Sequence, residues 1–326
     1  MTNKKSGGRW FLYSCFGCLG LAAFLAMIAV GVVGIAYMQV GAEEIQKKTI
    51  TPELPSAVIS PRSVELVPRS SAAADSSLPE APPGVDGLAA AGRIIMDAQQ
   101  GGFEIEPGKP GEALRLEASY DKNAYELEED LEADEEGVWT YRINFRRTGG
   151  GGLMAAIRQM VGGVKPSVRV ILPVDVPLEL EVRASQGGLE MDLGGLWLRT
   201  ADIQFQQGGV SLAFSQPLRE PMDRLTLNGS MGGFAALKLG NASPRTLDLD
   251  FSMGGGFLDL RGEWRNDSQI SISASMGGGE VRLPRDVAIE GLELDKPRPG
   301  STLELPLPTL RFTVSKSTLE NLEFND

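Results

Sequence analysis

Apolar and polar residues follow one recurring order in five consecutive segments of 22 or 23 residues. Each segment opens with two apolar residues separated by a mainly polar one, passes through a Gly-Gly pair, and then alternates again. The opening apolar pairs are Leu180 and Val182, Ile203 and Phe205, Leu225 and Leu227, Leu247 and Leu249, and Ile270 and Ile272. Alternation with a period of two is typical of a strand with one buried face. Each segment therefore predicts two or three short strands.

A fixed repeat of 20–50 residues indicates stacked units, because one unit cannot bury its own apolar face. The five segments show no helical period. We therefore predict a mainly β protein in which residues 179–291 form a single-stranded parallel β-solenoid of about five coils. In this interpretation Leu249 faces the core and Asp248 faces water.

The Gly-Gly pairs fall at the same place in every segment, which predicts a corner that each coil turns above the previous one. Such a corner needs a positive φ angle or a close approach of two backbones, and glycine tolerates both. The glycines expected in this column are Gly187, Gly188, Gly208, Gly209, Gly232, Gly233, Gly254, Gly255, Gly277 and Gly278.

Three of the glycine pairs follow a methionine, which is Met231, Met253 or Met276. We expect these side chains to stack and to pack beside the corner, because methionine fills irregular gaps. Thioether ligation of a soft metal such as Cu(I) is the alternative. We expect neither a metal nor a cofactor.

The segments on either side of the repeats also predict strands. Residues 86–178 are expected to form an N-terminal β segment with a short helical cap at 153–161. The acidic run at 126–136 predicts the solvated end of a hairpin, since the spacing of an EF-hand loop is absent. Residues 292–326 alternate again from Leu303 onward and predict a β cap over the last coil.

A membrane anchor is predicted at residues 10–40, which carry no charged side chain and are long enough to span a bilayer. Lys4, Lys5 and Arg9 precede this run. Their position favours a cytoplasmic tail at residues 1–9 and a solenoid outside the cytoplasm. A signal peptide that is cleaved after the run is the alternative.

Two cysteines, Cys15 and Cys18, lie inside this apolar run. A reactive CxxC motif needs an accessible site that stabilises a thiolate, so we interpret both as small apolar residues of the membrane helix. Residues 41–85 are expected to form a disordered Pro/Ser/Ala linker, because the seven prolines at 51–84 prevent a regular helix.

Charge and composition narrow the classes of function. Residues 51–326 carry 26 of the 31 basic and 41 of the 43 acidic residues, a net charge of −15. Such a surface argues against nucleic acid, whose phosphates are bound by Lys and Arg. The chain contains no histidine, the commonest general base and transition-metal ligand.

Four carboxylates on the second strands, Glu190, Asp192, Asp259 and Glu280, are the candidates for an acid/base set if they stack in one row. They are equally compatible with the solvated face of alternating strands. We favour the latter interpretation, so no catalytic residue is assigned.

The stretch from about 90 to 290 resembles the toast-rack and adhesin-like β-solenoid family, which includes the C-terminal domain of LiaF-type cell-wall-active antibiotic response proteins. The segments that carry the resemblance are "FEIEPG" at 103–108, "LPVDVPLELEV" at 172–182, "LGNASP" at 239–244 and "SMGGGFLDLRGEW" at 252–264. The resemblance implies a right-handed solenoid and a role in envelope-stress signalling or adhesion. LiaF-type proteins usually carry several membrane helices, whereas this sequence predicts one.

The sequence thus predicts a non-enzymatic, membrane-anchored bacterial envelope protein that binds an envelope protein or a cell-wall component, for signalling or adhesion. Association of two copies through solenoid faces is also open. The alternatives are an extracytoplasmic polysaccharide-active enzyme and a purely structural adhesin or spacer.

Overall fold

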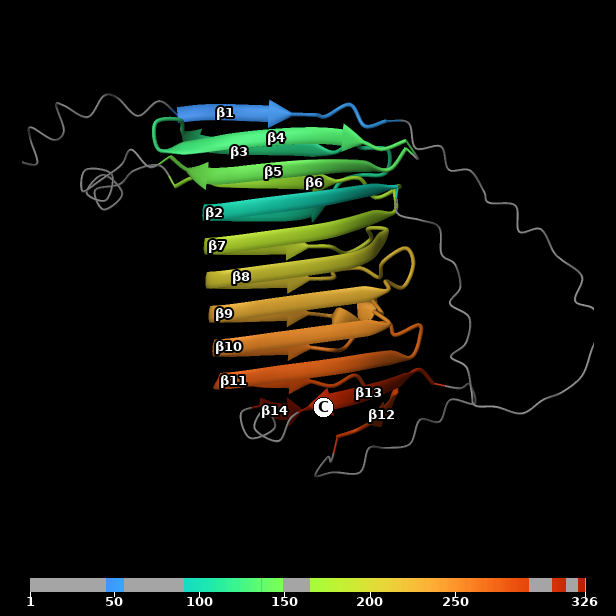
Figure 1. Ribbon diagram of the computed structural model, residues 1–326. Helices are drawn as coiled ribbons and strands as arrows, with labels where there is room; N and C mark the ends of the chain where they lie inside the picture. Colours follow the sequence, from blue (N-terminus) through green and yellow to red (C-terminus); the bar gives the residue numbers. More distant parts are fainter. Residues whose placement is uncertain are drawn as a thin grey trace, which may run out of the picture. The chain divides into compact units, whose positions relative to one another are not determined.

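The computed structural model describes residues 45–55, 91–135, 137–148, 165–292, 307–314 and 322–325. All of them belong to one compact unit. Their strands form one 14-stranded sheet, in which the order along the main path is β1-β3-β6-β2-β7-β8-β9-β10-β11-β13-β12 (Figure 1). The only helical element among these residues is the 3-10 turn Leu239–Asn241. The predicted mainly β class is confirmed.

The repeats form a stack of parallel strands in which each strand pairs with the next. The strands are β7 (Leu178–Asp192), β8 (Leu198–Ala213), β9 (Arg224–Leu237), β10 (Thr246–Asp259) and β11 (Ser268–Arg282). Two or three short strands per repeat were expected. Instead, one continuous strand of 14 to 16 residues passes through each glycine pair.

Each long strand folds back at its glycines into a first and a second arm, which Figure 1 draws as a front and a rear layer. The alternation of burial changes phase there. In β7 the buried residues include Leu180 and Val182 before the glycines and Leu189 and Met191 after them. The two arms therefore direct their apolar residues toward a shared core between them.

The stack contains one more strand than the sequence predicted. Strand β2 (Gly92–Pro107) pairs in parallel with β7 and places Gly101 beside Gly187. The repeat was expected to begin at residue 179. Its first member was missed because the chain leaves the stack after β2 and returns only at residue 178, so the period is interrupted.

Between β2 and β7 the chain adds four strands, β3 (Arg115–Asp121), β4 (Tyr125–Ala133), β5 (Trp139–Arg147) and β6 (Ser167–Leu172). Strand β5 pairs with the first arm of β2 and β6 with the second arm. Strand β1 (Ile45–Ile50) lies antiparallel to β3. The linker was expected to begin at residue 41, and the structure differs because residues 45–50 extend the sheet.

The acidic run was predicted to be the solvated end of a hairpin, and residues 134–135 do lie exposed in the turn between β4 and β5. The rest of the run differs, because it forms strand β4, antiparallel to β5, and faces arginines of that strand. Arg146 pairs with Glu128 at 2.8 Å, and Arg142 pairs with Glu132 at 2.6 Å. These exposed pairs contribute little stability individually, but they place two arginines beside four of the eight acidic residues of the run.

A more buried contact fastens β1 to this region. The Tyr141 hydroxyl donates a hydrogen bond to Glu129 at 2.6 Å, and the Lys48 ammonium lies 3.0 Å from the same carboxylate. Burial and the bond to the Glu129 carboxylate raise the pKa of Tyr141 well above its ordinary value. The hydroxyl therefore remains a hydrogen-bond donor.

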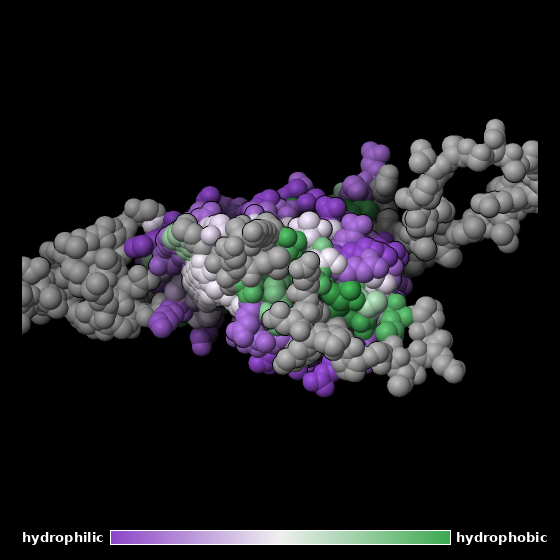
Figure 2. Space-filling model, turned by 90° about the horizontal axis from the view of Figure 1, so that it is seen from below, coloured by the Kyte–Doolittle hydropathy of each residue, from purple (hydrophilic) through white to green (hydrophobic). Residues whose placement is uncertain are grey.

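The far end of the stack carries the C-terminal strands β12 (Ala288–Glu290), β13 (Thr309–Val314) and β14 (Leu322–Asn325). Strand β13 pairs with the first arm of β11 and β14 with the second arm. Leu310 and Phe312 are buried. Viewed from this end, hydrophobic residues show inside the outline and hydrophilic ones around it (Figure 2). An open stack would expose that interior to water, which explains the extra strands.

Three predictions fall on residues outside the described ranges: the anchor at 10–40 with its two cysteines, the helical cap at 153–161 and most of the linker. Within the ranges that are described, no helix is both long and apolar enough to cross a membrane.

Candidate functional site

The glycine pairs form two parallel columns across the stack. We call the first residue of each pair a turn glycine and the second a floor glycine. The turn glycines in register are Gly101, Gly187, Gly208, Gly232, Gly254 and Gly277. The floor glycines in register are Gly102, Gly188, Gly209, Gly233, Gly255 and Gly278. The structure thus aligns all ten glycines of the expected corner and adds the pair from β2.

The backbone conformation requires the turn glycines. Gly208 has φ 132° and Gly254 has φ 133°, values that residues with a Cβ atom rarely adopt. A Cβ atom on Gly208 would lie 1.9 Å from the carbonyl oxygen of Gly187 in the neighbouring strand. The same atom on Gly254 would lie 1.8 Å from the Gly232 oxygen. Only glycine allows consecutive corners to approach this closely.

The fold does not require the floor glycines in the same way. A Cβ atom on Gly188 or Gly209 would meet no atom within 4 Å, and one on Gly233 would meet only the Gly255 oxygen at 3.9 Å. These residues have no positive φ angle. Glycine in a strand weakens it relative to a residue with a side chain. A column of floor glycines therefore points to a use for the bare surface.

The residues before the glycines form polar and apolar columns around the corner. Ser230, Ser252 and Ser275 each donate a hydroxyl hydrogen bond to a backbone carbonyl of the preceding strand, at 2.9 to 3.0 Å. The recurring Ser-Met-Gly-Gly sequence thus combines a hydroxyl that links strands with a glycine that permits the turn.

The methionines do not pack as expected. Met231 and Met253 are in register, but their side chains are 38% and 42% exposed. Met276 is in register with Met253, and its side chain lies outside what the structure describes. The predicted packing was wrong because the corner is convex, so that the side chain before each turn glycine points to solvent. Gln207 occupies the same column in β8.

Removal of one hydroxyl from the serine column should cost little but measurable stability. In Ser252→Ala, we expect the free energy of unfolding to fall by about 1 kcal/mol, because the Ser230 carbonyl loses the hydrogen bond from this hydroxyl. Urea denaturation measures this change. An unchanged midpoint would show that water replaces the hydroxyl at no cost.

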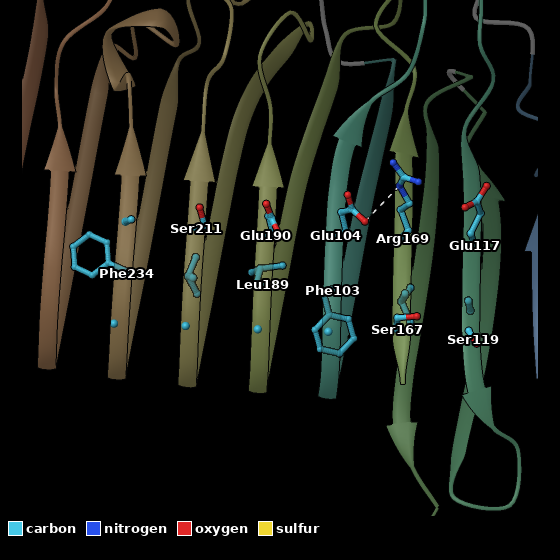
Figure 3. A pocket seen from close by; sticks show the side chains of 18 of the residues that line it. Phe103, Glu104, Glu117, Ser119, Ser167, Arg169, Leu189, Glu190, Ser211 and Phe234 are labelled. Atoms are coloured by element: carbon cyan, nitrogen blue, oxygen red, sulfur yellow. Dashed lines mark ion pairs between the residues drawn. The ribbon is translucent and has the colours of Figure 1, made fainter. Parts of the chain in front are cut away.

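A groove of about 1250 Å³ lies over the second arms, along the floor glycines. It crosses nine strands, from β1 to β11, at right angles to their direction. Its floor consists of the floor glycines, followed in register by Ser167, Ser119 and Lys47. Figure 3 shows this floor and the side chains beside it.

One row of side chains borders the floor. Two positions beyond the floor residues, the strands present in register Thr49, Glu117, Arg169, Glu104, Glu190, Ser211, Ala235 and Phe257. Arg169 lies 3.5 Å from Glu104, the ion pair drawn in Figure 3, and 2.6 Å from Glu106. Glu190 stands directly beside Glu104 in the ladder, and two like charges in this position repel each other.

The carboxylates considered for acid/base chemistry fall into two rows. Glu280 is in register with the row that borders the groove, but it does not line the groove and is four strands from Glu190. Asp192 accepts backbone hydrogen bonds from Gly194 at 3.0 Å and Ser215 at 3.1 Å, in the loops that leave the second arms. The set therefore does not assemble into one site.

Asp259, the fourth of these carboxylates, is buried and holds a turn together. It accepts hydrogen bonds from the Arg261 backbone at 3.0 Å and from the Arg261 guanidinium at 2.7 Å. Burial alone raises the pKa of Asp259, but the bonds from Arg261 and the charges of Arg261 and Arg282 outweigh it and hold this pKa below the ordinary value.

This shift predicts a dependence of stability on pH. Because folding lowers the pKa of Asp259, its carboxylate stabilises the protein above about pH 4 and loses that effect as the pH falls further. In Asp259→Asn, we expect a loss of about 1–2 kcal/mol at pH 7 and a flatter profile between pH 5 and 2. Urea midpoints across this range measure it, with Asp248→Asn, at a partly exposed carboxylate of the same strand, as the control. An unaltered acid slope in Asp259→Asn would contradict this role.

No three His, Cys, Asp or Glu side chains of the described ranges are grouped so that they could hold a metal ion. The groove itself was not recognised from the sequence. The second glycine of each pair was the available clue, because a corner of this kind needs only the first.

Comparisons with known proteins give one structural likeness. No protein-family model matches the chain, and no curated protein matches it. The crystal structure of a "putative cell adhesion protein" from Clostridium sporogenes is similar over 83% of this chain and 100% of that chain, with a TM-score of 0.44 and 11% sequence identity. Since no family model matches, the resemblance to LiaF-type proteins stays a prediction.

Proposed function

We propose that the chain is a non-enzymatic binding protein of the cell envelope, with adhesion as its role, and that the groove over the floor glycines holds its partner. The observation that carries this proposal is the column of glycines that the fold does not require. Side chains there would strengthen the strands but fill the groove, so their absence is explained by a bound partner.

The stack suits such a role because it is a preformed platform. Neighbouring strands stay in register through both arms, and the serine hydroxyls link successive corners. A groove fixed in this way loses little conformational entropy when a partner binds. Stacked repeats offer long surfaces of this kind.

The arrangement of carboxylates favours binding over hydrolysis. Glu190 and Glu280 lie four strand steps apart, roughly 19 Å, whereas the carboxylates of glycosidases are about 5–10 Å apart. Glu104 and Glu190 are neighbours, but they rise from the same side of the floor. Hydrolysis needs carboxylates that flank the bond, so we assign no catalytic residue.

The proposed location follows from the N-terminal composition. Residues 10–40 anchor the chain, the Pro-rich linker spaces it from the bilayer, and the sheet faces the outside of the cell. Protease added to intact cells should then remove the sheet domain. Protection until the cells are permeabilised would place it in the cytoplasm instead.

Adherence of cells that display the full chain tests the function. We expect the double variant Gly188→Val/Gly209→Val to abolish the adherence conferred by the wild-type chain, because two side chains fill the floor. Gln204→Val is the control, since it places the same side chain on the first arm of β8. Equal adherence of both variants and wild type would overturn the proposal.

A further inference from the structure

We propose that the ligand of this groove is an uncharged glycan chain that lies across the strands, along the axis of the stack. This inference rests on the proposed function and adds the chemical class of the partner. It follows from the shape of the floor, the hydrogen-bonding groups beside it and the balance of charge.

The shape of the groove suits a linear polymer. Its nine strands correspond to roughly 38 Å at ~4.8 Å per strand. Over β2 to β11 the floor has no side chain at all, because each strand contributes a floor glycine. The C–H face of a flat sugar ring gains dispersion contacts on such a surface, which any Cβ atom would hold away.

The hydrogen-bonding groups distinguish a glycan from a peptide. The backbone N–H and C=O groups of the floor strands pair with neighbouring strands, so the floor offers no peptide ladder to a ligand. A polypeptide bound here would bury amide groups without partners, at a cost for each one. A sugar chain has no such backbone, and its hydroxyls point outward from the ring edges.

Side chains in the floor and beside it supply partners for those hydroxyls. The side chains of Ser119 and Ser167 in the floor, and of Ser211 and Glu190 beside it, have no hydrogen bond or ion pair with any other described residue. A serine hydroxyl donates and accepts, and a carboxylate accepts. Sugar hydroxyls that donate to Glu190 also relieve its repulsion with Glu104.

The charges favour an uncharged polymer over a charged one. The lining contains three basic side chains, Lys47, Lys48 and Arg169, and three acidic ones, Glu104, Glu117 and Glu190. The basic groups gather at the end of the groove formed by β1, β3 and β6. No long stretch of the groove is therefore positively charged, as the binding of a polyanion would require. The net charge of −15 over residues 51–326 further repels polyanions.

Binding of defined oligosaccharides to the purified full-length chain tests this inference. The probes are cellohexaose, the hexamer of N-acetylglucosamine, the anionic hexagalacturonate and an extended Gly-Ser peptide. We expect at least one neutral hexasaccharide to bind, with affinity that rises from disaccharide to hexasaccharide because more strands are contacted. Gly188→Val/Gly209→Val should weaken it at least about tenfold, whereas Gln204→Val should not.

The outcomes separate this inference from the proposed function. If the glycine variants abolish adherence but every neutral glycan fails to bind, the groove is the binding surface and the ligand class is wrong. Preference for the peptide or for hexagalacturonate overturns the ligand class in the same way. Glycan binding that ignores the glycine variants, or that does not rise with chain length, overturns the groove as its site. Shortening of the bound glycan would contradict a non-enzymatic role.

Discussion

Gly208→Ala should unfold much of the stack or leave it severely destabilised. Gly208 has a φ angle of 132°. In addition, a Cβ atom at this residue would lie 1.9 Å from the carbonyl oxygen of Gly187. Relief of that overlap requires the two strands to separate at the corner, where both arms depend on their register. We expect a loss of at least about 3 kcal/mol. This is a large part of the 5–15 kcal/mol that stabilises a typical domain.

The adjacent residue provides the matched control. Gly209→Ala adds the same methyl group one position later, where no atom lies within 4 Å of it. We expect its stability to be unchanged or higher by up to about 1 kcal/mol, because alanine restricts the unfolded chain more than glycine does. Urea denaturation of both variants measures the difference. Similar losses at Gly208 and Gly209 would show that the two columns have the same structural role.

The internal repeats made the central part of this fold predictable. Alternation at period two identified which residues face the core, as for Leu180 and Val182 in β7, and the common spacing of glycines predicted parallel stacking. Both signals are local and repeated, so a single sequence contains them several times. The flanking segments lack this redundancy, which is why β1 was placed in the linker and β2 was not joined to the repeats.

The candidate site was less predictable than the fold, for a physical reason. The groove depends on what is absent, because a floor glycine and a turn glycine look alike in the sequence and differ only in φ angle and neighbours. Exposure of Met231 depended in the same way on which side of the corner is convex. Alternation distinguishes buried from exposed faces but does not tell which exposed face is hollow.

Leu249→Asp should destabilise the protein severely, whereas the neighbouring Asp248→Asn should leave it nearly unchanged. Leu249 is 2% exposed and lies in register between Leu227 and Ile272, which are equally buried. A carboxylate there has no partner, and its burial together with the lost leucine contacts should cost about 4 kcal/mol or more.

Asp248 points to the opposite face of β10, in register with Thr226 and Ser271. Its replacement by asparagine keeps the shape and alters only a charge in contact with water, so a change within about 0.5 kcal/mol is expected. Thermal denaturation of the two variants, read beside the wild type, gives the comparison. Because the same strand carries both residues, equal damage would contradict the assignment of these two faces. Damage by Asp248→Asn alone would indicate that the strand has slipped by one residue in register.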